Sequence, residues 1–481
     1  MRVDPAEAAD RRRAADEAVR PTIMKIPLED ILRVLGSGQT APSESQVAGY
    51  SVDTRTMQPG ELFFALRGPN HDGHDHVAAA FEHGAAAVVV DHVLPVGGIQ
   101  IVVPDTLPAL QELAVWARKD RVGRVVAVTG SAGKTTVKDI IAHLLATQHS
   151  VVGKTIGNFN NHVGVPLSIL RLPDSCNIAV LELGMNHTGE IRALARIARP
   201  EVGVVTNVGY AHVEFFEDSI EGVARAKREL IEELPYSNGI AVLNADDERV
   251  ARFRDTHPGP EITFGIRNPA DIEAKDVEFI AGGSRFKCDN ETFETTLAGT
   301  HGVLNILAGI AAARAFGIPA RRLRDAVATF ASGKMRGERT VQNAIVILND
   351  CYNSNPEAMR AMIDVLAAER AGRRIAVVGE MLELGLSAEP LHRGVGSYLA
   401  CRGIDVVIGI RGAARFIVDE AVRSGLSDSA AFFFEDPVEA GGLLRGMLRK
   451  GDAVLFKGSR GVRVEKALDA AFEEAPAGSV K

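Results

Sequence analysis

A short glycine-rich stretch directly after an apolar run carries the side chains best suited to chemistry. It reads Gly130-Ser131-Ala132-Gly133, and Lys134-Thr135-Thr136 opens the segment that follows. Glycines let backbone N–H groups curl around phosphate oxygens, and the start of a helix adds partial positive charge. Lys134 would neutralise the β- and γ-phosphates, and the Thr135 hydroxyl would reach a Mg²⁺ ion. The stretch therefore predicts an ATP site.

The common P-loop pattern has an earlier glycine, but the position five residues before Gly133 holds Val128. The loop is instead the compact form G-S-x-G-K-T-T, set directly after the apolar run 125–128. A chance glycine-rich turn with an exposed lysine is the alternative. The strand–loop–helix context favours the ATP site.

The length of 481 residues suggests about three domains. A formal net charge of −8 argues against a general nucleic-acid or anionic-membrane binder. The four cysteines form no C-x-x-C pair, which suits free thiols in a reducing cytosol. No apolar run approaches the roughly 18 residues of a membrane span, so we expect a cytoplasmic protein without stable membrane insertion. Residues 1–23 lack the apolar core of a secretory signal, and we expect a poorly ordered extension.

Residues 24–105 are predicted to form a small α/β module. Asp53, Thr54 and Arg55 follow a short apolar run, and the polar glycine-rich loop 68–74 comes next. Hydroxyl groups and an arginine beside such a loop can hold a nucleotide diphosphate. On these residues alone, a capped turn and a solvated loop are the better interpretation. The segment 105–122 is predicted to be a linker helix.

Residues 106–335 alternate apolar strands with amphipathic helices, which is typical of a mostly parallel sheet. Asn160 and Asn161 lie in an amide cluster that can cap local backbone or hold substrate and phosphate oxygens. Glu182 ends an apolar strand and is followed by His187. Because parallel sheets place chemistry at the carboxyl ends of their strands, we expect Glu182 to bind Mg²⁺. A solvated surface glutamate is the alternative.

Residues 336–481 are predicted to form a doubly wound, Rossmann-like domain. Strands are expected at 345–348, 375–378, 406–410, 431–434 and 453–456. Three polar stretches, 349–359, 379–385 and 457–460, each follow one of these strands. Singly, each is explained as a capped helix start. Together they are predicted to converge on one crevice.

Taken together, the motifs from residue 24 to 472 resemble those of the Mur ligases. S-x-D-T-R, P-G-x-L-F and D-G-H resemble their UDP-binding first domain, and G-S-x-G-K-T-T resembles the ATP loop they share with folylpolyglutamate synthetases. The three C-terminal stretches resemble the branch that joins D-alanyl-D-alanine to UDP-N-acetylmuramoyl-tripeptide. The resemblance implies three α/β parts: a UDP-binding domain (24–105), a central P-loop domain with a mostly parallel sheet (106–335) and a C-terminal Rossmann-like domain (336–481).

The resemblance also implies roles that spacing alone would not give. His212 helps to bind a second Mg²⁺, Lys227 is carbamylated, and Arg336 reaches the ATP phosphates. From spacing alone, His212 would be a histidine whose hydrogen bonds are made within the protein, Lys227 a solvent-exposed lysine, and Arg336 a charged residue of a linker. Asn305 lies on the adenine side and Asp350 orients the ribose, whereas Gly302 replaces a family asparagine. The implied substrate-binding residues are Asp53, Thr54, Arg55, Asn160, Asn161, His187, Asn353, Asn355, Lys457, Ser459 and Arg460.

The reaction that the resemblance implies activates a substrate carboxylate as an acyl phosphate, which the amine of D-alanyl-D-alanine then attacks. Lys134, Lys227, His212 and Arg336 would form its catalytic group, with ATP and two Mg²⁺ ions. A monomer without nucleic-acid partners is expected. One alternative is another ATP-dependent amide ligase, such as a sister Mur enzyme or folylpolyglutamate synthetase. The other is a P-loop NTPase switch, which is disfavoured because no acidic pair ends a buried strand.

Overall fold

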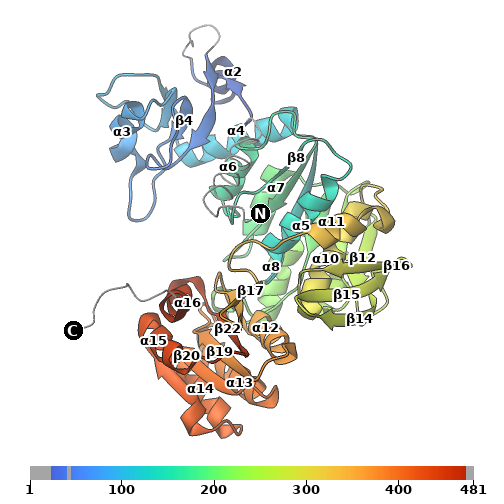
Figure 1. The fold of residues 1–481 in the computed structure, drawn as a ribbon. Helices are drawn as coiled ribbons and strands as arrows, with labels where there is room; N and C mark the ends of the chain where they lie inside the picture. The colour runs from blue at the N-terminus through green and yellow to red at the C-terminus, as the bar shows by residue number, and fades with distance from the viewer. Residues whose placement is uncertain (1–22, 39, 41–44, 473–481) are drawn as a thin grey trace, which may run out of the picture. The chain divides into compact units, whose positions relative to one another are not determined.

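The computed structural model describes residues 23–38, 40 and 45–472 (Figure 1). Two compact units are present, Met1–Val125 with His149–Leu181 and Arg196–Arg199, and Val126–Gln148 with Glu182–Ala195 and Pro200–Lys481. We call them the first and the second unit. The predicted extension at 1–23 lies, apart from Ile23, outside the described residues. The division at residues 105 and 335 stays a prediction.

The first unit is built around a small parallel sheet. Its strands, in the order β3-β4-β5-β6, are Gly49–Ser51, Glu61–Phe64, Ala87–Val90 and Gln100–Val102. Phe63, Val77 and Val88 belong to the core beneath it. The unit also holds helices α2 (Leu28–Val34), α3 (Val77–Glu82), α4 (Thr106–Arg121) and α6 (Gly164–Leu170), strands β1 (Ile26–Pro27), β2 (Gln46–Val47) and β8 (Val152–Lys154), and most of β9 (Ile178–Glu182). The helix predicted at 105–122 is confirmed as α4, and its role as a linker stays a prediction.

The largest sheet carries the glycine-rich loop and has the strand order β13-β12-β11-β10-β7-β9-β8. Its strands in chain order are β7 (Arg124–Thr129), β8, β9 (Ile178–Glu182), β10 (Val202–Val205), β11 (Ile240–Asn244), β12 (Glu261–Gly265) and β13 (Ile272–Glu273). Helices α5 (Lys134–Leu145), α7 (Glu190–Ala198), α8 (Ile220–Glu232) and α9 (Glu248–Ala251) follow strands of this sheet, and α10 (Gly299–Arg314) comes later in the chain. Helices α5 and α10 pack together so closely that a Cβ on Gly309 would lie 2.3 Å from Ile140 Cγ2 (Figure 1). The predicted parallel sheet is confirmed.

Residues 275–295 depart from the predicted strand–helix alternation. They form an antiparallel sheet of β14 (Lys275–Ile280), β15 (Gly283–Cys288) and β16 (Glu291–Thr295). Along β15, buried and exposed residues alternate in the way that one covered sheet face requires. Gly282 and the pair Asp289-Asn290 take positive φ at the turns. These short hairpins are signalled by turn residues and alternation, not by long apolar runs.

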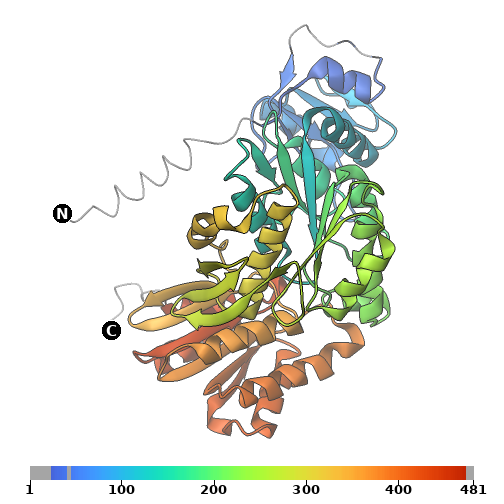
Figure 2. The same ribbon diagram turned by 90° about the vertical axis from the view of Figure 1, so that its right-hand side faces the viewer.

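The C-terminal sheet has the order β17-β18-β22-β19-β20-β21. Its strands are β17 (Glu338–Gln342), β18 (Ile345–Asp350), β19 (Arg373–Gly379), β20 (Val406–Ile410), β21 (Ala431–Phe434) and β22 (Asp452–Lys457). Helices α12 (Pro356–Ala368), α13 (Ala388–Cys401), α14 (Ala414–Arg423), α15 (Pro437–Met447) and α16 (Glu465–Phe472) connect or follow the strands, drawn in orange to red in Figure 2. All five predicted strands are confirmed. Strand β17 was not predicted, and it pairs antiparallel with β18 across a turn at Asn343-Ala344.

All four cysteines are free thiols, and three of them are buried. Within the described ranges, no helix combines the length and the apolar character needed to cross a membrane.

Candidate active site

The glycine-rich loop joins β7 to α5 and needs glycine at two positions. Gly130 has φ 152°, and a Cβ there would lie 1.9 Å from Thr206 Oγ1. Gly133 has φ 79°, and a Cβ there would lie 2.6 Å from Asn305 Oδ1. Neither conformation is one that a residue with a side chain favours. Asn305, predicted from sequence to lie on the nucleotide side, therefore abuts the loop from α10.

The end of β10 holds the loop in place. The Ser131 and Ala132 N–H groups donate to the carbonyl and the side-chain oxygen of Asn207, at 3.0 and 2.9 Å. Thr206 Oγ1 donates to the Ala132 carbonyl at 2.6 Å, and the Gly209 N–H donates to Ser131 Oγ at 2.8 Å. The N–H groups in the first turn of α5 have no acceptor within their own helix and point their partial positive charge at the loop. The start of α5 is thus suited to an anion.

Lys134 and Thr135 stand at the start of α5, as predicted. Lys134 Nζ donates to the Gly130 carbonyl at 2.7 Å and so lies over the loop. Burial lowers the pKa of Lys134, the Arg336 charge lowers it further, and Glu182 opposes both. Thr135 Oγ1 donates to Glu182 Oε2 at 2.7 Å, and both side chains are buried. The structure thus brings together the hydroxyl and the carboxylate that were expected to bind Mg²⁺.

Lys227 and His212 belong to the same region of the second unit. Lys227, on α8, is 1% exposed, and burial followed by the Lys134 charge holds its pKa well below the ordinary value. Among the described residues its ammonium makes no hydrogen bond or ion pair. Burial also lowers the pKa of His212, against an opposing effect of Glu383, whose carboxylate lies 2.6 Å from His212 Nδ1. The charges of Lys134 and Lys227 both lower the pKa of His212.

The chemistry of these residues suits a metal ion. A buried hydroxyl–carboxylate pair offers the oxygen ligands that Mg²⁺ prefers. Lys227 is a buried amine without a counter-ion, which is the state in which a lysine can take up CO₂ and become an anionic ligand. Thr135, Glu182, His212 and a carbamylated Lys227 therefore fit the group of metal ligands that the sequence suggested.

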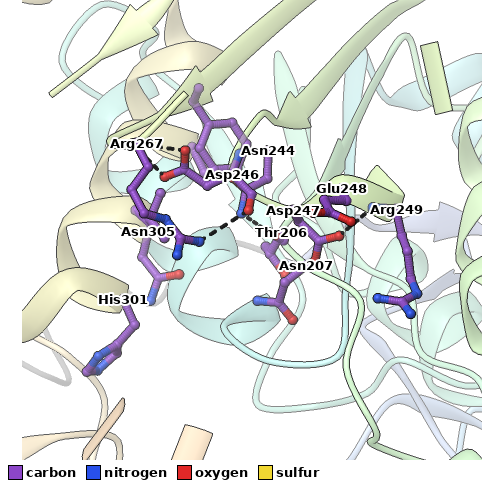
Figure 3. A pocket seen from close by; sticks show the side chains of 13 residues that line it. Thr206, Asn207, Asn244, Asp246, Asp247, Glu248, Arg249, Arg267, His301 and Asn305 are labelled. Atoms are coloured by element: carbon purple, nitrogen blue, oxygen red, sulfur yellow. Dashed lines mark hydrogen bonds between the residues drawn. The ribbon is translucent and has the colours of Figure 1, made fainter. Parts of the chain in front are cut away.

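A cavity of about 330 Å³ opens beside the loop (Figure 3). Phe264, Leu304 and Ala308 supply its apolar lining. The polar lining comes from Thr206, Asn207, Asn244, Asp246, Asp247, Glu248, Arg249, Arg267, His301 and Asn305. A pocket with an apolar wall and a few polar groups suits a flat heterocycle joined to a sugar. Because Thr206, Asn207 and Asn305 also contact the glycine-rich loop, the cavity and the anion site are continuous.

Local hydrogen bonds fix the polar wall of this cavity. The Asp246 carboxylate accepts the N–H groups of Ile266, Arg267 and Asn268 at 2.8, 3.0 and 2.8 Å. Asp247 caps α9 and accepts the Val208 N–H at 2.7 Å. The Asp246 and Asp247 carboxylates thus accept hydrogen bonds from backbone N–H groups and hold this wall of the cavity in place.

The three C-terminal stretches do converge, at the carboxyl ends of β18, β19 and β22. Lys457 Nζ lies 2.5 Å from Asp350 Oδ2 and 2.9 Å from the Asn353 carbonyl oxygen. Ser459 Oγ accepts the Leu382 N–H at 2.9 Å. The predicted crevice would lie at this edge, where β18 and β19 flank β22 at a change in strand order, which is where open α/β sheets bind ligands. Asp350 is thus engaged with Lys457 and does not line the cavity of Figure 3.

The crevice is joined to the glycine-rich loop. Asn355 caps α12 by accepting the Ala358 N–H at 2.8 Å, and its Nδ2 donates to the Ser131 carbonyl at 3.3 Å. Glu357, two residues further on, accepts the Tyr210 N–H at 3.2 Å. Arg336 lies over the Tyr352 ring, with Cζ 3.7 Å from its centroid, and its charge reaches Lys134. Arg460, in contrast, is exposed and pairs with Glu465.

Five other expected substrate residues lie in the first unit. Asp53 forms an exposed ion pair with Arg55 at 2.6 Å, and Thr54 lies between them. Asn161 caps local backbone by accepting the N–H groups of Val163 and Gly164 at 3.2 and 2.8 Å, and Asn160 precedes it. In the second unit, the exposed His187 contacts Glu190 and the Phe215 ring. Their substrate roles stay predictions.

The D-G-H stretch supplies a structural histidine. His74 Nδ1 lies 2.6 Å from Asp72, and His74 Nε2 accepts the Asp91 N–H at 3.1 Å. Although His74, Asp91 and His92 could bring ligand atoms within 4.8 Å of one another, both ring nitrogens of His74 are already engaged. Arg67 also balances the two carboxylates. These contacts fasten the loop and do not form a metal site.

Family models match three parts of the chain: "Mur ligase family, catalytic domain" at 46–116, "Mur ligase middle domain" at 128–313 and "Mur ligase, glutamate ligase domain" at 335–460. A Bacillus subtilis protein named UDP-N-acetylmuramoyl-tripeptide–D-alanyl-D-alanine ligase is 36% identical over 435 residues, covering 88% of this chain and 93% of its own. The chain belongs to the Mur ligase family. An Escherichia coli protein of the same name is 33% identical over 461 residues, covering 94% of this chain and 99% of its own.

Solved structures agree with the family. Crystal structure I of MurF from Acinetobacter baumannii superposes with a TM-score of 0.86 at 27% identity, covering 94% of this chain and all of its own. MurF ligase from Thermotoga maritima, solved in complex with ADP, gives a TM-score of 0.77 at 30% identity, covering 88% of this chain and 96% of its own. The three-part α/β architecture inferred from the Mur ligase resemblance is thereby confirmed as the fold of this chain.

Several residues of this Mur ligase site carried little signal in the sequence. Thr206 and Asn207 follow an ordinary apolar strand, yet they anchor the loop. Phe264 and Arg267 enter the cavity from β12 and the turn after it, without a motif. Glu383 sits in the recognised stretch 379–385, but its pairing with His212 joins residues 171 positions apart. Such pairings arise from the tertiary fold and leave no periodic pattern in the sequence.

Proposed function

We propose that this chain is an ATP-dependent amide ligase that joins D-alanyl-D-alanine to UDP-N-acetylmuramoyl-tripeptide in peptidoglycan precursor synthesis. One observation carries the proposal: the contact of Asn355 with the Ser131 carbonyl links the C-terminal crevice to the phosphate loop. A ligase that transfers an activated acyl group to an amine needs its nucleotide and its acceptor within one reaction space. The names of the full-length relatives supply the identity of the acceptor and the donor.

ATP is assigned to the loop and the cavity of Figure 3. The glycine-rich loop Gly130, Ser131, Ala132 and Gly133 and the start of α5, with Thr135 and Thr136, are assigned to the phosphates, and Asn305 borders the nucleoside. Lys134 and Arg336 supply fixed positive charge to the transferred phosphoryl group. Phosphoryl transfer depends chiefly on positioning and charge neutralisation, so this arrangement suffices without a covalent enzyme intermediate.

The acyl phosphate is formed when the terminal carboxylate of the muramoyl tripeptide attacks the γ-phosphate of ATP, and ADP leaves as the bond to the β–γ bridging oxygen breaks. The amine of D-alanyl-D-alanine then attacks the acyl carbon, and phosphate leaves through a tetrahedral intermediate. Thr135, Glu182, His212 and a carbamylated Lys227 would hold two Mg²⁺ ions near these groups. When bound, the ions neutralise the phosphate and carboxylate charges. Before metal binds, the buried Lys227 amine, whose pKa is held well below its ordinary value, is the group that would take up CO₂.

The substrate-binding residues fall into two groups in this proposal. Asp53, Thr54, Arg55, Asn160, Asn161 and His187 are assigned to the nucleotide-linked muramoyl peptide. Asn353, Asn355, Lys457, Ser459 and Arg460 are assigned to the dipeptide and to the closed state, with Asp350 holding Lys457. Arginine suits the dipeptide carboxylate because its two parallel N–H groups match both oxygens. We further propose a cytoplasmic monomer, since both nucleotide substrates are cytoplasmic compounds.

The test is phosphate release from Mg²⁺-ATP with UDP-N-acetylmuramoyl-tripeptide, with and without D-alanyl-D-alanine, followed by mass spectrometry. We expect release that depends on the dipeptide and a product heavier by one dipeptide unit. Release with a single amino acid but not with the dipeptide would assign the chain to a sister ligase. Release that needs no acceptor would refute the ligase function and favour a nucleotide-dependent switch.

A further inference from the structure

Two loops of the second unit meet at His212 and Glu383. His212 precedes the short helix η2 (Val213–Phe216), and Glu383 lies in the segment Gly379–Gly385 that follows β19. Glu383 Oε2 lies 2.6 Å from His212 Nδ1. Nδ1 is buried and has no well-aligned hydrogen bond among the described residues, so Glu383 is the acceptor within its reach. Catalytic hydrogen bonds are often poorly aligned before substrates bind and tighten afterwards.

Both residues have unusual backbones. His212 has φ 67° and Glu383 has φ 63°, in the left-handed region that residues with a side chain seldom occupy. Such conformations persist where the surrounding structure requires them, and they gather at functional sites. Here, two residues with this conformation place their side chains against each other.

Two further hydrogen bonds tie the same loops together. The Glu214 N–H donates to the Glu383 carbonyl at 3.3 Å, and the Leu386 N–H donates to Asp218 Oδ1 at 3.1 Å. The second bond lies beyond the His212–Glu383 contact and does not touch the imidazole. The chain thus offers one contact that holds the ring and another that only joins the loops.

The position of Glu383 decides which nitrogen of His212 is available. A neutral imidazole has one N–H donor and one lone pair. If Nδ1 donates to the carboxylate, Nε2 keeps its lone pair and the ring cannot rotate freely. Histidines that bind metals generally donate their other ring nitrogen to a carboxylate or a carbonyl in this way.

We propose that Glu383 is a positioning residue that orients His212, so that the segment Gly379–Gly385 of the C-terminal part completes the metal site beside the glycine-rich loop. The inference rests on the proposed function, because His212 is assigned there as a metal ligand. Docking of this segment and assembly of the second metal site are then a single event. A role confined to joining the two loops is the competing explanation.

The test measures Mn²⁺ binding by electron paramagnetic resonance, in the presence of a non-hydrolysable ATP analogue. The full-length variants are Glu383→Ala, Glu383→Gln, His212→Ala and the matched control Asp218→Gly. Glycine tolerates the positive φ of residue 218 and removes only the loop-joining carboxylate. Circular dichroism and thermal melting confirm that each variant is folded.

We expect Glu383→Ala and His212→Ala to weaken the second Mn²⁺ site about tenfold or more, while Asp218→Gly leaves it unchanged. Glu383→Gln should recover part of the affinity, because its amide oxygen still accepts from Nδ1–H. In turnover assays, Glu383→Ala should raise the Mg²⁺ concentration for half-maximal rate more than it lowers the rate at saturating Mg²⁺.

Wild-type Mn²⁺ binding by Glu383→Ala would overturn the inference. Equal weakening by Asp218→Gly would also overturn it and assign both residues to loop joining. No effect of His212→Ala would remove His212 from the metal site and the inference with it. Failure of the proposed ligase reaction itself would appear separately, as wild-type protein that binds two Mn²⁺ ions but forms no product with the dipeptide.

Discussion

The substitution Gly133→Ala tests how tightly the glycine-rich loop is built. Residue 133 has φ 79°, which costs a residue with a Cβ about 1–2 kcal/mol. The new Cβ would also lie 2.6 Å from Asn305 Oδ1, and a contact that short must be relieved. Because that oxygen ends a short side chain, Asn305 can turn away. Asn305 would then leave the nucleotide cavity, so part of the cost of Gly133→Ala should appear as weaker binding of ADP.

We therefore expect Gly133→Ala to lose about 1–2 kcal/mol of unfolding free energy from the backbone alone, and to bind ADP about tenfold more weakly. Asn305→Ala in the same chain removes the close contact but not the backbone strain. In a double-mutant cycle on the free energy of unfolding, the double variant should thus be more stable than the sum of the two single effects predicts, by about 1 kcal/mol. Urea unfolding is followed by circular dichroism, because the single tryptophan, Trp116, lies in the first unit. Isothermal titration with ADP gives the affinities.

Two outcomes would refute this reasoning. If Gly133→Ala unfolds and binds ADP like the wild type, the left-handed conformation and the Asn305 contact are wrong. If the two substitutions are strictly additive, residue 133 and Asn305 do not touch. Gly317→Ala is the matched control, since Gly317 has φ 76° and a Cβ there would meet no neighbouring atom within 4 Å. That variant should show the backbone cost without any change in ADP affinity.

Three further outcomes are expected. Lys134→Ala should abolish turnover, by at least about a thousandfold; near-normal product formation by that variant would remove the phosphate-loop assignment. Lys227→Ala should lose activity and regain part of it with a short added carboxylate, whereas full activity without rescue would exclude the carbamate. Burial lowers the pKa of His392, whose Nε2 accepts the Met381 N–H at 2.9 Å, so the unfolded chain binds the proton more readily. The contribution of His392 to the free energy of unfolding should therefore be complete above pH 6.5 and decline below it. The free energies of unfolding of the wild type and of His392→Gln, measured by urea titration, should then converge in acid.

The strands of the C-terminal sheet were predictable because each is a short apolar run bounded by polar turns. The five predicted strands fall within β18 to β22, and most bounds differ by two residues or fewer. Strand β17 was missed because its residues are mostly exposed and polar, as suits an edge strand. The antiparallel strands at 275–295 were missed for a similar reason, since half of their residues face solvent.

The candidate site was predictable where function requires a special backbone or an unusual cluster. The glycines at 130 and 133, with Lys134 and Thr135, were found because chemistry and conformation both restrict the sequence there. The partner of each residue was not predictable in the same way. That Thr135 bonds to Glu182, and Lys457 to Asp350, depends on which strands are neighbours in each sheet. The spacing of residues along the chain does not reveal the order of the strands in a sheet.

The phosphate loop of this Mur ligase is not a self-contained motif, because segments far apart in the chain determine its shape. Ser131 alone contacts three other residues: its N–H donates to Asn207, its hydroxyl bonds with Gly209, and its carbonyl accepts from Asn355 of the C-terminal part. A change in the position of the start of α12 would therefore be transmitted to the loop through Ser131. The same docking brings Glu383 to His212. In the proposed reaction, these shared hydrogen bonds would couple phosphate binding to acceptor binding, and a two-step ligase needs such coupling to delay phosphoryl transfer until the acceptor is in place.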